Sequence, residues 1–287
     1  MKHENKVNVI LFFALICVST ASIFARWLDP VPAVAIAMWR MLLGSAFLWM
    51  YSLFYPQSGM TSKNKLLTMI SGMFLGLHFL FFFTAIKMTT IANATFLATL
   101  APLFTILIET LIFRKKIIPG VIFGLFITFV GMVIIIGGKL EFEHDQLMGN
   151  LSALTSSFWI SITYLITEKV RRTTGTLSYS RSLYLWAAVL LFVTALIFDT
   201  SVFSFTSMEF TGLLLIGLIP TVFGHSLLYY SLRFVSPSIV ASVPLGEPVI
   251  ASVLAMMIFN EFPGILVFVG GAVILMGLFK IISSRNN

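Results

Sequence analysis

Long apolar stretches separated by short polar turns make up nearly the whole chain. Each is close to the ~20 residues that a helix needs to cross a ~30 Å hydrocarbon core. No polar turn is long enough to fold as a soluble domain. The pattern therefore predicts an all-α integral membrane protein with ten transmembrane helices. We expect these helices at residues 7–25, 31–54, 66–86, 91–113, 118–137, 147–167, 179–198, 209–231, 237–259 and 263–282.

The second half of the chain resembles the first when the sequence is shifted by 146 residues. The shift superposes Pro102 on Pro248, Gly124 on Gly270, and Gly131 on Gly277. Because five expected spans per half is an odd number, the two halves must cross the membrane in opposite directions, an arrangement typical of secondary transporters. We therefore predict two inverted five-helix repeats. They cover residues 1–140 and 147–283, followed by a cytoplasmic tail at 284–287.

Composition and charge agree with a bilayer protein. The chain is 59% hydrophobic and 10% charged, with a mean hydropathy of +1.02. A net charge of +7 could indicate nucleic acid, but the cations lie in small groups beside the apolar runs and report orientation instead. With the N-terminus inside, fourteen of the 18 Lys and Arg residues fall on the cytoplasmic side and three outside. We expect a protein of the cytoplasmic membrane with both termini in the cytoplasm and no nucleic-acid partner.

The N-terminal segment has a second interpretation, a secretory signal cleaved after Ala25. Its apolar run is long for such a signal, and cleavage would remove one span from the first repeat, so we expect the helix to be retained. Cys17 is the only cysteine, which excludes an intramolecular disulfide.

A degenerate motif and its neighbours carry a family resemblance. The relevant residues are VPLGEPVIA at Val243–Ala251, Phe259-Asn260-Glu261, Gly270-Gly271, and, in the first half, Arg40, Leu97–Ile108, Gly124 and Gly131. On these residues the whole chain resembles the EamA-like ten-helix carriers of the drug/metabolite transporter superfamily. The resemblance implies a basket of two inverted bundles around a cavity lined mainly by the first, third, fourth, sixth, eighth and ninth helices. It implies substrates that range from amino acids to nucleobases, cofactors and drugs. One residue departs from the family pattern. Lys115 stands at the first-half position that corresponds to Glu261, and the family often has an acid at both positions.

Two ionisable residues inside the expected spans require an explanation, because such a group costs from a few to ~10 kcal/mol unless it faces a cavity or a partner. Glu247 directly precedes Pro248, which should break the helix and expose backbone oxygens. Pro102 should break the fourth span in the same way. Its carboxylate could bind a proton, a cation or a substrate amine, or hold helices together. Arg40 lies deep in the second span. It could clamp the helices through a carboxylate or carbonyl, or contact a substrate carboxylate.

Polar side chains also mark three further spans. Thr95, Pro102 and Glu109 recur at sevens with Thr99 beside them and should face inward, although Glu109 could instead sit in the interface beside Arg114 or Lys116. Hydroxyl groups in the sixth span either line a polar cavity or permit tight packing. His78 and His225 could relay protons or contact substrate, or be neutral histidines bonded within the bundle. The remaining cavity candidates are Ser156, Trp159, Thr163, Tyr164 and Tyr229.

The leading hypothesis is a secondary transporter that exports small metabolites, such as amino acids or their derivatives, by alternating access, with proton coupling as an option. Two alternatives are a membrane-embedded enzyme that uses His78, His225 and Glu247 as acid and base, and a passive facilitator. We expect no catalytic residue, cofactor or metal site, because neither a nucleotide-binding motif nor a ligand cluster is present. Gly270, Gly271 and Gly277 offer small surfaces for contacts within the bundle or between the protomers of a homodimer.

Overall fold

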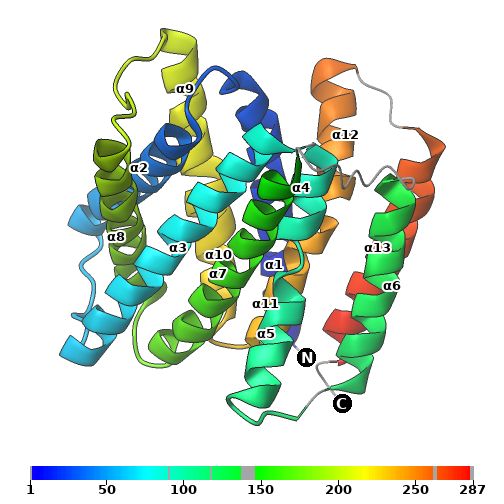
Figure 1. The fold of residues 1–287 in the computed structure, drawn as a ribbon. Coiled ribbons are helices and arrows are strands. Elements are labelled where there is room, and N and C mark those ends of the chain that lie inside the picture. The colour runs from blue at the N-terminus through cyan, green and yellow to red at the C-terminus, as the bar shows by residue number, and fades with distance from the viewer. Residues whose placement is uncertain (1, 90, 117, 137–145, 261–263, 285–287) are drawn as a thin grey trace.

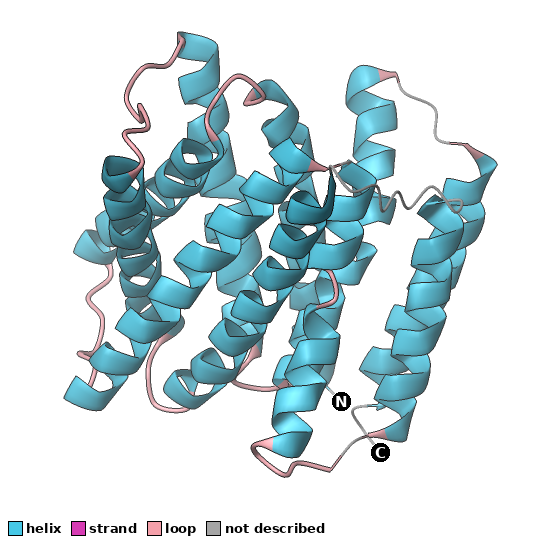
Figure 2. Cartoon of the chain, viewed as in Figure 1, coloured by secondary structure: helices cyan, strands magenta, loops and turns pink. Residues whose placement is uncertain are grey.

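A computed structural model of the chain describes residues 2–89, 91–116, 118–136, 146–260 and 264–284, and these residues form helices joined by turns, without strands (Figures 1 and 2). The first half comprises α1 (Lys2–Trp27), α2 (Ala33–Phe54), α3 (Ser62–Met88), α4 (Ile91–Ala98), α5 (Ala101–Leu111) and α6 (Pro119–Ile136). The second half comprises α7 (Leu147–Arg171), α8 (Thr176–Ile197), α9 (Ser207–Ile216), η2 (Gly217–His225), α10 (Ser226–Ser231), α11 (Pro237–Ser242), η3 (Val243–Gly246), α12 (Glu247–Phe259) and α13 (Ile265–Ser283).

The helices have the dimensions of membrane spans. Among the described residues, eight helical segments are long and apolar enough to cross a bilayer, and α6 is a shorter apolar helix. The 25 residues of α7 also suffice in length, although its many hydroxyl side chains make it more polar. The protein is therefore an all-α multi-pass membrane protein of about ten helices, as the hydropathy pattern predicted.

The two halves are inverted relative to each other. The N- and C-terminal ends of the chain lie at the same end of the bundle, whereas α6 ends and α7 begins at the opposite end (Figure 1). We call the end that carries the termini the terminal end and the other the distal end. The first helix of one half thus starts where the first helix of the other half finishes.

Glycine contacts between α6 and α13 follow the same two-fold relation. A Cβ added at Gly124 would lie 2.8 Å from the carbonyl oxygen of Gly277, and one added at Gly131 would lie 2.7 Å from that of Gly270. A shift of 146 residues converts one of these contacts into the other. Gly271 packs against Val249 of α12. All these glycines therefore serve helix contacts within the chain.

Two of the expected spans are interrupted at mid-depth. The chain between α4 and α5 leaves the helix at Thr99 and Leu100, and α11 passes through the 3₁₀ turn η3 before α12 begins. Pro102 and Pro248 occupy the first turns of α5 and α12, where a missing backbone N–H costs nothing. Both interruptions lie just before the two prolines at which the sequence predicts a helix break.

The eighth span contains an interruption that the sequence analysis did not anticipate. Its middle third, η2, is a π-helix with Pro220 inside it. A proline cannot donate the ordinary helical hydrogen bond and clashes with the preceding turn, so the backbone widens locally.

Some of the charged residues on which the predicted orientation depends lie outside the described residues, namely Lys139, Glu141, Glu143, Asp145 and Glu261.

Candidate functional site

Arg40 of α2 anchors a polar cluster in the middle of the bundle. Its side chain is 1% exposed, and its Nε donates a hydrogen bond of 2.9 Å to Thr221 Oγ1 of η2. The guanidinium carbon lies 4.2 Å from the ring centroid of Phe79 on α3. Within the described chain no carboxylate oxygen lies within 4.0 Å of Arg40. The terminal nitrogens of this buried cation therefore remain available to an anion.

Close packing between α2 and η2 sets the position of Arg40. A Cβ added at Gly44 would lie 2.8 Å from Thr221 Cγ2, and one added at Gly217 would lie 2.8 Å from Leu43 Cβ. Two glycines one turn from the anchor thus bring the backbones together, so that Nε reaches the threonine hydroxyl. Any larger side chain at either position would push α2 away from η2.

The widened backbone of η2 also supplies hydrogen-bond acceptors. The hydroxyl of Tyr184 on α8 donates to the carbonyl oxygen of Thr221 at 3.0 Å, and Thr221 Oγ1 donates to that of Ile216 at 2.8 Å. Irregular helices expose carbonyl groups in this way, and π-bulges occur frequently at functional sites. Thr221 therefore connects Arg40 with Tyr184.

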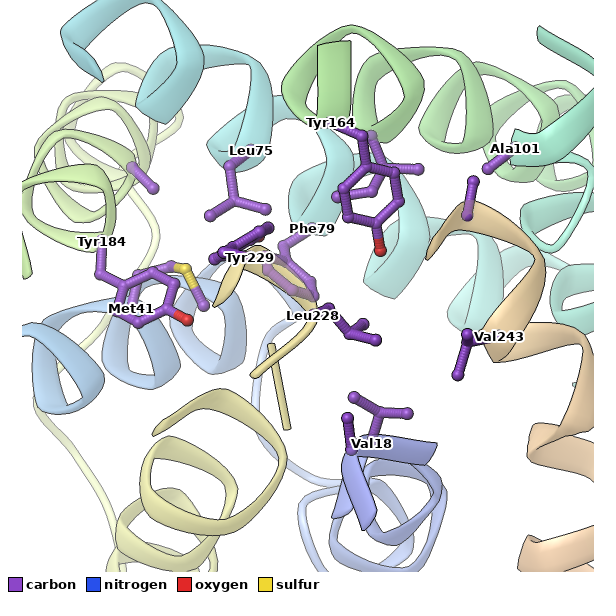
Figure 3. Packing of buried hydrophobic residues seen from close by; sticks show 14 of the residues in the cluster. Val18, Met41, Leu75, Phe79, Ala101, Tyr164, Tyr184, Leu228, Tyr229 and Val243 are labelled. Atoms are coloured by element: carbon purple, nitrogen blue, oxygen red, sulfur yellow. The ribbon is translucent and has the colours of Figure 1, made fainter. Parts of the chain in front are cut away.

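Four tyrosines and a histidine form an aromatic cluster beside Arg40. The ring of Tyr229 on α10 lies 6.0–6.2 Å from the rings of Tyr164, Tyr179, Tyr184 and His225. Tyr164, Tyr184 and Tyr229 converge on the interior from three different helices, with Phe79 beside them (Figure 3). The hydroxyl of Tyr229 and Nδ1 of His225 are buried without a hydrogen-bond partner in the described protein. Unsatisfied buried groups are rare, and they suggest a place for a ligand or water.

The two histidines differ in their bonding. Nδ1 of His78 donates to the carbonyl oxygen of Ser156 on α7 at 2.9 Å, because a carbonyl group can only accept. His78 is therefore held as a bonded histidine of the bundle. His225 makes only ring contacts, including one of 5.4 Å between its centroid and that of Phe79. Nδ1 of His78 is thus bonded within the bundle, whereas Nδ1 of His225 has no partner among the described residues.

Glu247 faces the same interior from the other half of the chain. It is the first residue of α12 and is partly exposed although it lies at mid-span. It makes no hydrogen bond or ion pair with any residue that the structure describes. Its charge nevertheless acts electrostatically on Arg40 and on Tyr164. An acid and a base thus attract one another across the interior without direct contact.

Most hydroxyl groups of α7 bond within the helix instead of lining a cavity. Ser156 donates to the carbonyl oxygen of Ala153 and Thr163 to that of Trp159. Ser161 additionally donates at 2.8 Å to the carbonyl oxygen of Ala101, next to the break between α4 and α5. The packing alternative thus accounts for these hydroxyls. The indole nitrogen of Trp159 is an exception, since it is buried without a partner.

The polar positions of α4 and α5 do not form one stripe. The helix break separates Thr95 and Thr99 from Glu109, and Thr99 donates to the carbonyl oxygen of Phe96. Glu109 binds Lys115 at 2.8 Å and accepts a hydrogen bond from Ser238 of α11. The alternative that placed Glu109 beside Arg114 or Lys116 named the wrong partner.

The turn after α5 explains why Lys115 is the partner of Glu109. Arg114 has a positive φ of 52°, and the N–H of Lys115 then bonds to the carbonyl oxygen of Glu109 at 2.9 Å. The ammonium group also lies 3.1 Å from Glu168 of α7. Burial alone would lower the pKa of Lys115, but the two carboxylates outweigh it and raise the pKa. We call Glu109, Lys115, Glu168 and Ser238 the terminal-end latch, because they join α5, α7 and α11.

Comparisons with known proteins agree with this architecture. The model of the EamA-like transporter family matches residues 5–137 and again residues 147–283. An uncharacterized transporter from Archaeoglobus fulgidus is 23% identical over 96% of this chain and 97% of its own length. The uncharacterized transporter YxxF from Bacillus subtilis is 22% identical over 88% of this chain and 82% of its own length. A solved crystal structure shares the fold, with a TM-score of 0.83, 18% identity and 98% coverage of both chains.

The helical architecture and these relatives define a multi-pass membrane transporter. The double match to one family model spans almost the entire chain. The chain belongs to the EamA-like transporter family.

Sequence reasoning found some members of the central cluster and missed others. Arg40, Tyr164, His225, Tyr229 and Glu247 were candidates, and the structure brings them to one interior. The missed members are Thr221, Tyr179, Tyr184 and the buried Arg171, whose Nε donates to the carbonyl oxygen of Tyr229 at 3.2 Å. The proline of the eighth span could have indicated Thr221, which follows Pro220 directly. The sequence analysis included Arg171 only among the cations that predict the orientation, although the structure buries it with 2% of its surface exposed.

Proposed function

We propose that the protein is a secondary transporter that exports small amphoteric metabolites, such as amino acids or their derivatives, across the cytoplasmic membrane by alternating access. The observation that carries the proposal is the placement of Arg40 and Glu247. One contributes a cation from the first half and the other an anion from the second, and neither is neutralised by a direct partner.

The chemistry of the interior favours a substrate with a carboxylate at one end and an amine at the other. Arg40 can bind a carboxylate through its terminal nitrogens, which are left free when Nε bonds Thr221. Glu247 can bind the amine. The tyrosine rings of the cluster provide an aromatic wall, and the Tyr229 hydroxyl can supply one further hydrogen bond.

The packing of the broken helices supports alternating access. At the terminal end α5 packs on α11, whereas at the distal end no comparably close packing joins α4 and α12 among the described residues. From this difference we infer that the interior is closed at the terminal end in this conformation. The pseudo-two-fold axis relates this state to one closed at the opposite end, which is the second conformation that a carrier needs.

The test is uptake of radiolabelled amino acids into proteoliposomes, after a thermal-shift screen of metabolites has selected the ligand. We expect saturable transport in the wild-type protein and a large loss of transport and of ligand-induced thermal stabilisation in both Arg40→Gln and Arg40→Lys, because lysine lacks the planar fork. Arg233→Gln, an exposed cation outside the cluster, is the matched control. Uptake that does not saturate would indicate a passive facilitator, and chemical conversion of the ligand would indicate an enzyme.

Proton coupling is tested by Glu247→Gln, which keeps the hydrogen-bonding shape and removes the titrating group. If Glu247 carries the coupling proton, proton-driven accumulation collapses while substrate exchange survives. If it binds the substrate amine, both activities and thermal stabilisation fall together. Unchanged accumulation in this variant would remove Glu247 from the site.

Orientation is tested with single cysteines in a Cys17→Ser background. We infer that the terminal end faces the cytoplasm. Cysteines at Ser62 and Thr174 should therefore resist an impermeant thiol reagent in whole cells, whereas cysteines at Asp199 and Glu209 should react. Labelling of the first pair in intact cells would reverse the topology.

A further inference from the structure

A cavity lies at the terminal end between α2, α3 and α8, apart from the central cluster. Its volume is about 420 Å³, within the range of ligand pockets. Two cations and two tryptophans dominate its lining, namely Lys65, Arg181, Trp49 and Trp186. None of these residues belongs to the terminal-end latch or to the aromatic cluster around Arg40.

The positive charge of this cavity is not neutralised. The guanidinium carbon of Arg181 lies 3.9 Å from the ring centroid of Trp49, and Nε of Arg181 is buried without a hydrogen-bond partner. Within the described part of the chain, neither Arg181 nor Lys65 has a carboxylate oxygen within 4.0 Å. The serine hydroxyls nearby donate elsewhere, since Ser178 bonds the carbonyl oxygen of Ser58 and Ser182 that of Ser178. The cavity therefore presents unsatisfied donors to an anion.

An apolar track leads from this cavity toward the membrane interior. Arg181, Leu185 and Val189 recur at fours and so share one face of α8. Leu185 is 38% exposed and Val189 is 43% exposed. Trp49, 43% exposed, stands beside the charged group. Tryptophan is typical of the headgroup level, and apolar side chains below it offer a surface to an acyl chain.

We propose that this cavity binds an anionic glycerophospholipid, with the phosphate at Arg181 and Lys65 and an acyl chain along Leu185 and Val189. The cation distribution predicts that the terminal end faces the cytoplasmic leaflet, where anionic lipids collect, and basic pockets between membrane helices bind such headgroups. The charged cavity and the exposed apolar residues on the same face of α8 favour a lipid over a soluble anion. The apolar residues can bind an acyl chain but would contribute nothing to the binding of a soluble anion.

The experiment measures lipid binding and does not depend on transport. The full-length protein is placed in nanodiscs of phosphatidylcholine, and phosphatidylglycerol with brominated acyl chains is titrated in while tryptophan fluorescence is recorded. We expect brominated phosphatidylglycerol to quench at a lower mole fraction than brominated phosphatidylcholine. The preference should disappear in Trp49→Phe/Trp186→Phe, which removes the reporters nearest the cavity.

Charge variants test the recognition itself. Arg181→Gln and Lys65→Gln should each reduce the preference for phosphatidylglycerol about fivefold, the effect of one cation near an anionic surface. The exposed Arg233→Gln at the same end should leave it unchanged. Because Lys65 is exposed, its variant remains informative if Arg181→Gln fails to fold. Equal quenching by the two brominated lipids, or loss of the preference on addition of inorganic phosphate at constant ionic strength, would overturn the proposal.

Discussion

The two ends of the broken helices differ in how they meet. At the terminal end, Glu109 of α5 accepts a hydrogen bond from Ser238 of α11 and pairs with Lys115. At the distal end, α4 and α12 are the symmetry-related elements, but they do not pack closely in the described structure. The shift of 146 residues places Ala255 where Glu109 stands and Ala92 where Ser238 stands. The fold is therefore nearly symmetric, whereas the chemistry that closes its two ends is not.

This difference indicates how a pseudo-symmetric carrier can favour one conformation. A polar latch stabilises closure at the terminal end, whereas the sequence has Ala255 and Ala92 at the positions that correspond to Glu109 and Ser238. Hydrogen bonds to charged groups contribute roughly 1.5–3 kcal/mol, enough to shift a two-state equilibrium by tenfold or more. We infer that the resting protein is closed at the terminal end because of these few residues.

The largest effect should come from reversing the charge in the latch. Glu109→Lys places a second cation beside Lys115 and should open the terminal end. Breaking a buried ion pair costs roughly 3–5 kcal/mol, but Lys115 is 39% exposed, so we expect about 2 kcal/mol, or about a 30-fold shift. The measurement is the rate at which a thiol reagent added from the terminal end labels Ser242→Cys, a buried position one turn above Ser238 in a Cys17→Ser background.

The control for this variant is Lys116→Glu, an exposed charge change in the same turn. It should leave the labelling rate at the wild-type value. An unchanged rate in Glu109→Lys, with normal expression and thermal stability, would show that the latch does not determine which end is closed.

A smaller effect should follow from moving the latch to the distal end. Glu109→Ala with Ser238→Ala removes it, and Ala255→Glu with Ala92→Ser installs the pair at the symmetry-related positions. The fourfold variant should label at Ser242→Cys about fivefold faster than the double variant, for a gain of about 1 kcal/mol at a partly exposed site. Equal labelling in the two variants would mean that the distal end does not close by the symmetry-related contact.

The smallest effect should appear at alkaline pH. Because the folded-state pKa of Lys115 is raised, its contribution to closure is complete below the ordinary lysine pKa and is lost only as the pH rises through the folded value. The thiol itself titrates at about pH 8.5 and becomes more reactive as it does so, so the labelling rate of Ser242→Cys is divided by the rate of the same cysteine in the Lys115→Gln background. This ratio should be constant up to the ordinary lysine value of 10.5 and increase reversibly above it. A change of the ratio at neutral pH would point to a different titrating group.

Sequence reasoning recovered the global arrangement because hydropathy and the 146-residue shift are properties of long segments. Gly124 and Gly277 could be matched to their counterparts before any contact was known. Local geometry was harder to obtain. Pro102 indicates a break in the fourth span, but the spacing of Thr95, Pro102 and Glu109 does not show that this break removes their common face. The positive φ of Arg114, which selects Lys115 over its neighbours, has no sequence signal.

The central cluster was only partly predictable for a related reason. Arg40 and Glu247 stand out because a charge in a span is rare, whereas Tyr179 and Tyr184 look like ordinary interfacial aromatics until the fold brings them beside Tyr229. For the hydroxyl groups of α7, in contrast, the sequence signal is strong but does not identify the site. Their spacing is periodic, yet most of them donate to carbonyl groups of their own helix.

The glycine contacts between α6 and α13 also bear on biogenesis. Gly124 and Gly131 can meet their partners only after the last span of the chain has been synthesised and inserted. Until then the fifth span has an unpaired glycine face in the lipid. The first repeat therefore cannot complete its packing before translation of the chain ends. We expect truncated chains that lack α13 to be recognised as unassembled and removed by membrane proteases, even though nearly all residues of the central cluster are already present.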